Sequence, residues 1–318
     1  MSNREYLSTD ASAPVITGQI GGFLPALRAI LVTGYGSVPG AGWTEVFTGT
    51  NVAVFRAPSG NMRYLRVDDS AILEMRLVGY ESMSDVNTGT DPFPTAGQVS
   101  GGLFCRKSAG SDATQRPWIA YASDTAFYFF IFANSTSLGA TTSGDAFLAF
   151  GDFTSYFPGD AFNSFIIAAG ATGATASRGA QKGNPTAATF ITSMAGHYTP
   201  RLYTQIGAAA RFAKTNRDLL GASSTVLSGP ASSGSYPDPI IGGLLMSPLE
   251  VWEEPTTGVF VRRGKLPGLW AAHHNSPIAH TDTFSGTGAL SGKSFRALTC
   301  YNSTSVGQMI VERTSPWG

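Results

Sequence analysis

The chain has 318 residues, and its 21 Lys and Arg residues balance its 21 Asp and Glu residues. Charged residues make up 13% of the sequence, against roughly 25% in an ordinary soluble domain. A neutral chain lacks the basic surface that nucleic-acid binding requires, so we expect no nucleic-acid partner. No apolar run approaches the roughly 20 residues of a membrane span, and no signal peptide is visible, so we expect no membrane insertion. Two cysteines, Cys105 and Cys300, are too few for a disulfide framework or a zinc site.

The N-terminal region, residues 1–34, combines an extended arm with a helix. Residues 1–18 are small and polar and show no period, which predicts the arm. The segment Phe23–Val32 repeats apolar residues at helical spacing and ends before Gly34, which predicts the helix. We interpret residues 1–34 as a docking segment and expect removal of residues 1–18 to leave the rest of the chain folded.

Residues 35–170 are predicted to form a β-rich body. Apolar and polar residues alternate with a period of two, as in half-buried antiparallel strands. The expected strands are Thr44–Phe47, Val52–Phe55, Met62–Val67, Ile72–Val78, Leu103–Cys105, Trp118–Ala122, Phe127–Phe132, Phe147–Phe150 and Phe162–Ile167. The run Phe127–Phe132 is apolar on both faces, which indicates a central strand. Residues 82–100 are rich in Pro, Gly and Asp and predict a long loop.

Residues 186–318 form a second β-rich part, joined to the body by the low-complexity stretch 170–188. That stretch is either a linker between domains or a loop within one domain. A second short helix is expected at Ile206–Ala213. Further strands are expected at Ile240–Met246, Leu249–Trp252, Val259–Arg262, Phe295–Tyr301 and Gln308–Arg313. The prediction is a mainly β protein, an antiparallel β-sandwich or barrel with long Gly/Ser-rich loops and one or two short helices.

One segment, Gly286–Ser294, comes near to a phosphate-binding loop. Such a loop needs Gly, four residues and then Gly-Lys-Ser/Thr, but Thr287 stands where the first Gly is required. The following residues also predict a strand where that motif needs a helix. We therefore interpret the segment as a turn that leads into a strand.

The titratable residues form no convincing catalytic or metal-binding pattern. His273, His274, His280 and Asp282 share one loop, but we favour histidines that are satisfied by hydrogen bonds over a metal site. Glu253 and Glu254 are adjacent in a predicted strand and face opposite sides, so we interpret them as a solvated strand end. A scattered group of acids is better explained by turns than by calcium binding: Asp68, Asp69, Glu81, Asp85 and Asp91. We expect no catalytic, cofactor-binding or metal-binding residues, and hence no enzyme.

Several stretches together carry a family resemblance. They are residues 13–19, 42–51, 64–70, 79–89, 92–94, 258–270 and 280–284, and the similarity covers about residues 13 to 300. The chain resembles a family of tailed-bacteriophage virion structural proteins. The resemblance implies a component of the phage particle, made in the host cytoplasm, and carries over no catalytic residue.

The expected function is therefore a non-enzymatic particle component that assembles as a homo-oligomer. Its expected partners are copies of itself and other phage virion proteins of the head, neck or tail. Low charge fits this expectation, because the cores of subunit interfaces are depleted in charged residues. Four tryptophans are candidates for core or interface anchors, with the core role favoured: Trp43, Trp118, Trp252 and Trp270.

Two alternatives stay open at this point. The first is a tail-tip module that binds a receptor or glycan through loop aromatics near Tyr156-Phe157 and Tyr236-Pro237. The second is an enzyme such as a depolymerase, which would need a positioned pair of carboxylates or a bound metal.

Overall fold

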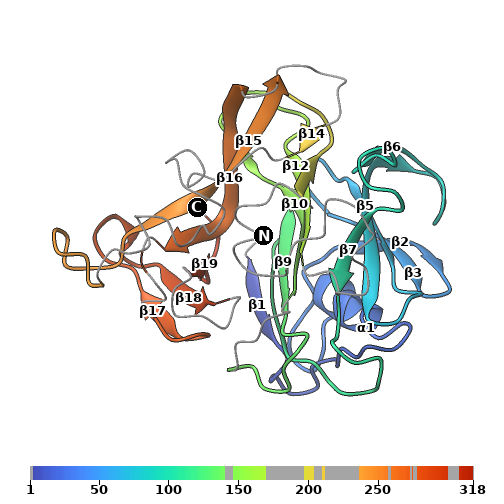
Figure 1. Cartoon of the computed structure of the whole chain (residues 1–318), viewed down its shortest axis with the longest axis horizontal. Coiled ribbons are helices and arrows are strands. Elements are labelled where there is room, and N and C mark those ends of the chain that lie inside the picture. Colours follow the sequence, from blue (N-terminus) through green and yellow to red (C-terminus); the bar gives the residue numbers. More distant parts are fainter. Residues whose placement is uncertain are drawn as a thin grey trace.

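The protein is built from three antiparallel β-sheets, as a computed structural model shows (Figure 1). The structure describes residues 3–139, 146–169, 197–203, 210–211, 236–256, 259–272, 274, 278–299 and 308–317. Of these described residues, 46% lie in strands and 6% in helices, so the mainly β prediction is confirmed. The predicted linker, residues 170–188, lies outside the described residues.

The first sheet has seven strands and lies in the middle of the molecule (Figure 1). In sheet order they are β1 (Arg4–Leu7), β8 (Trp118–Ala122), β9 (Ala126–Ile131), β10 (Ala146–Asp152), β12 (Ser164–Ala169), β13 (His197–Thr199) and β14 (Ala210–Arg211). Strands from both sides of residues 170–188 thus share one sheet.

The other two sheets flank the middle one. One consists of β2 (Thr44–Gly49), β3 (Val52–Arg56), β4 (Tyr64–Asp68), β5 (Glu74–Met83), β6 (Gly89–Phe93) and β7 (Leu103–Arg106). The other consists of β11 (Thr154–Ser155), β15 (Met246–Thr256), β16 (Val259–Ala272), β17 (Thr283–Ser285), β18 (Ser294–Leu298) and β19 (Met309–Glu312). A 3₁₀ turn, η5 (Gly288–Leu290), lies between β17 and β18.

Strand β9 explains why three layers form. Phe127, Phe129 and Ile131 belong to the core shared with the β2–β7 sheet. The alternate residues Tyr128 and Phe130 belong to the core shared with β15, β16 and β19. Because successive side chains of a strand point to opposite faces, a strand that is apolar throughout must be covered on both sides. The central position predicted for this segment is confirmed.

The predicted N-terminal helix is present as α1 (Leu24–Arg28), continued by the π-turn η1 (Ala29–Thr33). Asp69 caps its start from a distant turn, since its Oδ2 accepts hydrogen bonds from the backbone N–H groups of Phe23 and Leu24 at 2.7 and 3.1 Å. Gly34 ends the helix with a φ of 76°, a backbone conformation that favours glycine.

The predicted arm is extended, but it is part of the body of the same chain. Strand β1 pairs with β8, and the side chains of Tyr6 and Ile16 are fully buried. The backbone N–H of Arg116 donates to the carbonyl of Ile16 at 2.8 Å. Because removal of residues 1–18 would expose these core residues, we expect it to destabilise the fold, contrary to the expectation from the sequence.

Three other segments differ from the prediction. The loop expected at 82–100 contains β6, whose turn with β5 is formed by residues 84–88. Within the helix expected at Ile206–Ala213, the two described residues form strand β14. The strand expected at Ile240–Met246 begins only at Met246, because Gly242 and Gly243 close a turn before it. Among the helices of the described part of the chain, none is long and apolar enough to cross a membrane.

Candidate functional site

The phosphate-loop-like segment is a turn into a strand, as predicted. Gly288–Leu290 forms the short 3₁₀ turn, and β18 follows from Ser294. Lys293, the lysine of the motif, donates to the Glu312 carboxylate at 2.8 Å. The segment therefore has neither the helix nor the free lysine that phosphate binding needs.

Two histidines of the predicted loop, His274 and His280, accept hydrogen bonds from backbone N–H groups. His274 is buried, and its Nε2 accepts a hydrogen bond from the Leu245 N–H at 3.1 Å. His280 Nδ1 accepts from the Thr299 N–H at 3.0 Å, and burial lowers the pKa of His280 to about 4. His273 lies outside the described residues. Within the described ranges, no three His, Cys, Asp or Glu side chains are grouped as metal ligands.

Two of the acidic residues have roles that the sequence analysis missed. Glu253 is buried, not solvated: it accepts the Tyr203 N–H at 2.8 Å and lies 3.4 Å from Arg263. Asp69 is also buried, in contact with Lys107. The turn prediction is confirmed for Asp85, whose Oδ1 accepts the N–H groups of residues 87 and 88 at 2.7 and 2.9 Å.

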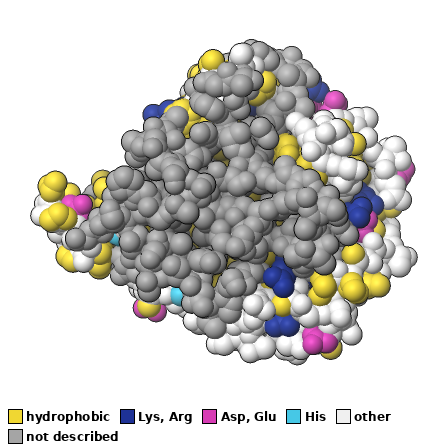
Figure 2. All heavy atoms as spheres, viewed as in Figure 1, with side chains coloured by type: hydrophobic (Ala, Val, Ile, Leu, Met, Phe, Trp, Pro, Cys, Tyr) yellow, Lys and Arg dark blue, Asp and Glu magenta, His cyan; other side chains and the backbone are white. Residues whose placement is uncertain are grey.

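An apolar projection, residues 236–245, stands out from the molecule at the left of Figure 1, and we call it the tip. Its exposed fractions are 91% at Ile240, 59% at Ile241, 45% at Leu245 and 49% at Tyr236. Figure 2 shows hydrophobic side chains gathered at this extremity. Scattered exposed apolar residues are ordinary, but a contiguous apolar group on a projection is typical of an interaction site.

Asp238 organises the tip. Its Oδ1 accepts the N–H groups of Ile240 and Ile241 at 2.9 and 3.0 Å, while its backbone pairs with Gly242 and Gly243. This is the local turn chemistry that Asp favours. The two isoleucines are therefore presented on a closed turn, and the sequence Pro-Asp-Pro-Ile-Ile-Gly-Gly was the signal for that turn.

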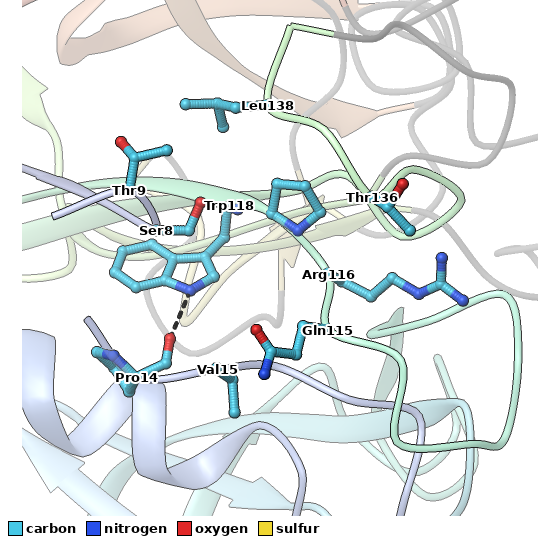
Figure 3. A pocket seen from close by; sticks show the side chains of 10 residues that line it. Ser8, Thr9, Pro14, Val15, Gln115, Arg116, Trp118, Thr136 and Leu138 are labelled. Atoms are coloured by element: carbon cyan, nitrogen blue, oxygen red, sulfur yellow. Dashed lines mark hydrogen bonds between the residues drawn. The ribbon is translucent and has the colours of Figure 1, made fainter. Parts of the chain in front are cut away.

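A pocket of about 160 Å³ opens where the N-terminal segment crosses the start of β8 (Figure 3). Pro14 and Val15 lie on one side and Leu138 on another. The Trp118 indole, fully buried, donates to the Pro14 carbonyl at 2.9 Å and supports the wall. The remaining lining residues are Ser8, Thr9, Gln115, Arg116, Pro117 and Thr136.

Arg116 is the one ionisable residue among those that line the pocket. It is buried and held in place, since its Nε donates to Ser108 Oγ at 2.9 Å and its Nη1 to the Ser135 carbonyl at 3.3 Å. Half of the residues that line the pocket are polar, and the Arg116 guanidinium is occupied by its hydrogen bonds to Ser108 and Ser135.

The loop aromatics have partners within the chain. Tyr156 is 45% exposed, its hydroxyl donates to Glu250 Oε1 at 3.1 Å, and the Arg262 guanidinium lies 5.7 Å from its ring. Phe157 stacks on Tyr203 with ring centroids 4.4 Å apart.

The favoured core role is confirmed for three tryptophans. Trp43, Trp118 and Trp252 are buried. Trp270 is half-buried and packs against the small cluster around Phe295.

Comparison with known proteins adds no assignment. No family model matches the chain, and no curated protein matches it. The functional argument therefore depends on the surface features above together with the resemblance of the sequence.

Proposed function

We propose that the chain is a non-enzymatic structural subunit of a tailed-phage particle, which assembles as a homo-oligomer and docks on neighbouring virion proteins. The family resemblance supports the particle, and the apolar tip supports the docking. The tip is the observation that carries the proposal, because an ordered, solvent-exposed aliphatic pair is stabilised only when a partner covers it.

The composition of the tip favours a protein partner over a lipid surface. Residues 236–245 contain no Lys or Arg, and Asp238 is their one charged residue. Segments that bind membrane surfaces combine apolar residues with Lys and Arg, which attract anionic headgroups. A tip with one negative charge lacks that attraction.

The pocket offers a matching surface on a second copy of the chain. The tip presents exposed aliphatic side chains, and the pocket offers Val15 and Leu138 as aliphatic contacts. Because tip and pocket are different surfaces, their contact is head-to-tail, and repetition of it closes a ring if the rotation permits.

The first experiment locates the protein. Purified particles are separated into head and tail fractions, and the copy number of the chain in each is measured by mass spectrometry. Enrichment in heads or in tails supports a structural subunit. Absence from both fractions would contradict the proposal.

The second experiment tests the contact by sedimentation of the purified full chain. The tip variant Ile240→Ser/Ile241→Ser and the pocket variant Val15→Glu should each sediment as monomers, whereas the wild type forms oligomers. Ile72→Ser is the matched control, because Ile72 is 53% exposed and lies in the β4–β5 turn, outside both tip and pocket. An equal mixture of the two variants should form only pairs, since each pair retains one intact tip and one intact pocket. A wild-type chain that stays monomeric would refute this contact.

A second candidate function is receptor or glycan binding through the surface around Tyr156. The exposed Tyr156 ring and the half-exposed Arg262 offer aromatic and polar contacts, and the buried Glu250 carboxylate holds both side chains in place. Binding of the purified chain to host cells, lost in Tyr156→Ala but kept in the tip variant, would favour this candidate. Equal binding by both variants, or none by the wild type, would count against it.

A further inference from the structure

Lys107 and Asp69 form an ion pair that is completely shielded from water. Both side chains have 0% exposure, and Lys107 Nζ contacts Asp69 Oδ1. Lys107 follows β7, while Asp69 follows β4, and 38 positions separate them in sequence. A buried pair of this kind pays a large desolvation cost, because neither charge is hydrated.

The second carboxylate oxygen lies between two fixed hydrogen-bond donors. Asp69 Oδ2 accepts the N–H of Phe23 at 2.7 Å and the N–H of Leu24 at 3.1 Å. Two backbone N–H groups at such distances are the arrangement that stabilises the oxyanion of a tetrahedral intermediate in acyl transfer. The Asp69 carboxyl is therefore positioned to react as an acyl group. Its Oδ2 accepts two backbone hydrogen bonds, and its Oδ1 contacts the Lys107 side-chain nitrogen.

The surroundings also favour the uncharged carboxyl group that amide formation needs. Burial raises the pKa of Asp69, although Lys107 and the two backbone N–H groups oppose that effect. Transfer of one proton from the ammonium to the carboxylate would remove both charges from the apolar interior and leave a nucleophilic amine beside a carboxylic acid.

We propose that Lys107 and Asp69 join spontaneously in an intramolecular isopeptide bond. Lys107 Nζ attacks Asp69 Cγ, and the negative charge that develops on Oδ2 is stabilised by the N–H groups of Phe23 and Leu24. The bond from Cγ to Oδ1 then breaks, and Oδ1 leaves as water with the carboxyl proton and one amine proton. A carboxylic acid and an amine thus give an amide and one water, with no oxidant or co-reactant.

The product keeps the hydrogen bonds of the pair. Oδ2 becomes the amide oxygen and continues to accept from Phe23 and Leu24. Lys107 Nζ also donates to the Ala71 carbonyl at 2.9 Å, and the single N–H of the amide can retain that bond. The reaction therefore removes two buried charges without leaving a polar group unsatisfied. The bond would connect the end of β4 to the end of β7, and the start of α1 would stay hydrogen-bonded to the amide oxygen.

Intact mass spectrometry of the denatured full chain tests the proposal directly. The expected result is a mass lower than that of the sequence by about 18 Da, one water. A tryptic digest should contain residues 67–76 covalently attached to the peptide that begins at Lys107, with no cleavage after Lys107. This peptide is sought in the wild-type protein, so the result does not depend on the folding of a variant.

Three variants sharpen the test. Lys107→Arg should show the full mass, because a guanidinium does not attack the carboxyl. Lys293→Arg is the matched control, since Lys293 pairs with Glu312 at 2.8 Å but is 28% exposed, and it should keep the loss of water. Asp69→Asn should form the same amide with loss of ammonia, about 17 Da. The proposal would be overturned if the wild-type protein, even after long incubation, had the full mass and gave the two peptides separately.

Discussion

Glu5 and Arg313 join the two ends of the chain. Arg313 Nε and Nη2 donate to Glu5 Oε1 and Oε2 at 2.9 and 2.8 Å, across 308 positions of sequence. Arg296 donates to the same two oxygens at 2.9 and 3.2 Å, and the Tyr121 hydroxyl donates to Oε1 at 2.7 Å. Glu5 lies in the middle sheet, whereas Arg296 lies in β18 and Arg313 directly follows β19, so one carboxylate connects two layers.

Substitution of Glu5 should destabilise the protein in a pH-dependent way. Burial raises the pKa of Glu5, but the hydrogen bonds from Arg313, Arg296 and Tyr121 outweigh it, and the pKa lies below its ordinary value of 4.5. The carboxylate therefore stabilises the fold above that value, and the stabilisation is lost as the pH falls through the lowered pKa. Glu5→Gln should reduce the free energy of unfolding at neutral pH by about 2 kcal/mol, as measured by urea denaturation.

The pH dependence of the stability loss in Glu5→Gln tests whether the charge of Glu5 stabilises the fold. The difference in the free energy of unfolding between the wild type and Glu5→Gln should shrink as the pH falls below 4.5, because the wild-type carboxyl becomes protonated as the pH passes its lowered pKa. Asp282→Asn serves as a control, since that side chain is exposed and should leave the free energy of unfolding near the wild-type value. A difference that stays constant with pH would show that the charge of Glu5 is not what stabilises the contact.

Removal of residues 1–18 should unfold or strongly destabilise the chain. The deletion takes away strand β1, the buried Tyr6 side chain and the Glu5 carboxylate, and it leaves one edge of β8 unpaired. Circular dichroism and thermal denaturation of the truncated chain check this expectation. A truncated chain with the stability of the full chain would show that the N-terminal segment is a separable arm after all.

The sequence predicted most of the strands but not which distant residues would meet. Strands such as Trp118–Ala122 follow from local alternation, and the two-sided burial of β9 follows from its unbroken apolar run. The partner of Asp69 could not be predicted in this way, because a turn acid and a buried ion-pair acid look alike in sequence. The strand expected from Ile240 onward is wrong for a related reason. Apolar residues predict a strand, but the turn made by Asp238, Gly242 and Gly243 leaves the Ile240 side chain exposed.

Gly79 is required by its neighbour across the strand pair. It lies opposite Phe93, and a Cβ on Gly79 would come within 2.5 Å of two atoms of the Phe93 ring. Phe93 is fully buried and stacks on Phe150, so the ring has no room to withdraw. Gly79→Ala should lower the free energy of unfolding, measured by urea denaturation, by about 1–3 kcal/mol.

The control for this substitution is Gly97→Ala, where the nearest atom to the new Cβ is 4.0 Å away. It should leave the stability within about 0.5 kcal/mol of the wild type. Equal losses in both variants would contradict the steric explanation and indicate a general cost of replacing glycine.

Two adjacent arginines of β16 should differ widely in their contribution to stability. Arg263 has 0% exposure, and its Nε and Nη2 donate to the two carboxylate oxygens of Asp160 at 2.9 and 2.8 Å. It also lies 3.4 Å from the buried Glu253. Arg263→Met would leave the buried Asp160 carboxylate without its cation, which should cost about 3–5 kcal/mol in the free energy of unfolding. Arg262→Met should cost less than about 1 kcal/mol, because the Arg262 side chain is 57% exposed.

The pH dependence of the stability loss in Arg263→Met identifies the cause of that loss. In the wild type, burial raises the pKa of Asp160, but the hydrogen bonds and charge of Arg263 outweigh it and hold the pKa below its ordinary value. Without Arg263, burial dominates and the pKa of Asp160 rises, so the carboxyl of the variant takes up a proton earlier as the pH falls. Protonation of Asp160 removes the unpaired charge of the variant. The difference in the free energy of unfolding between wild type and variant should therefore become smaller in mild acid. A loss that is the same in acid and at neutral pH would point to the packing of the Arg263 side chain instead of its charge.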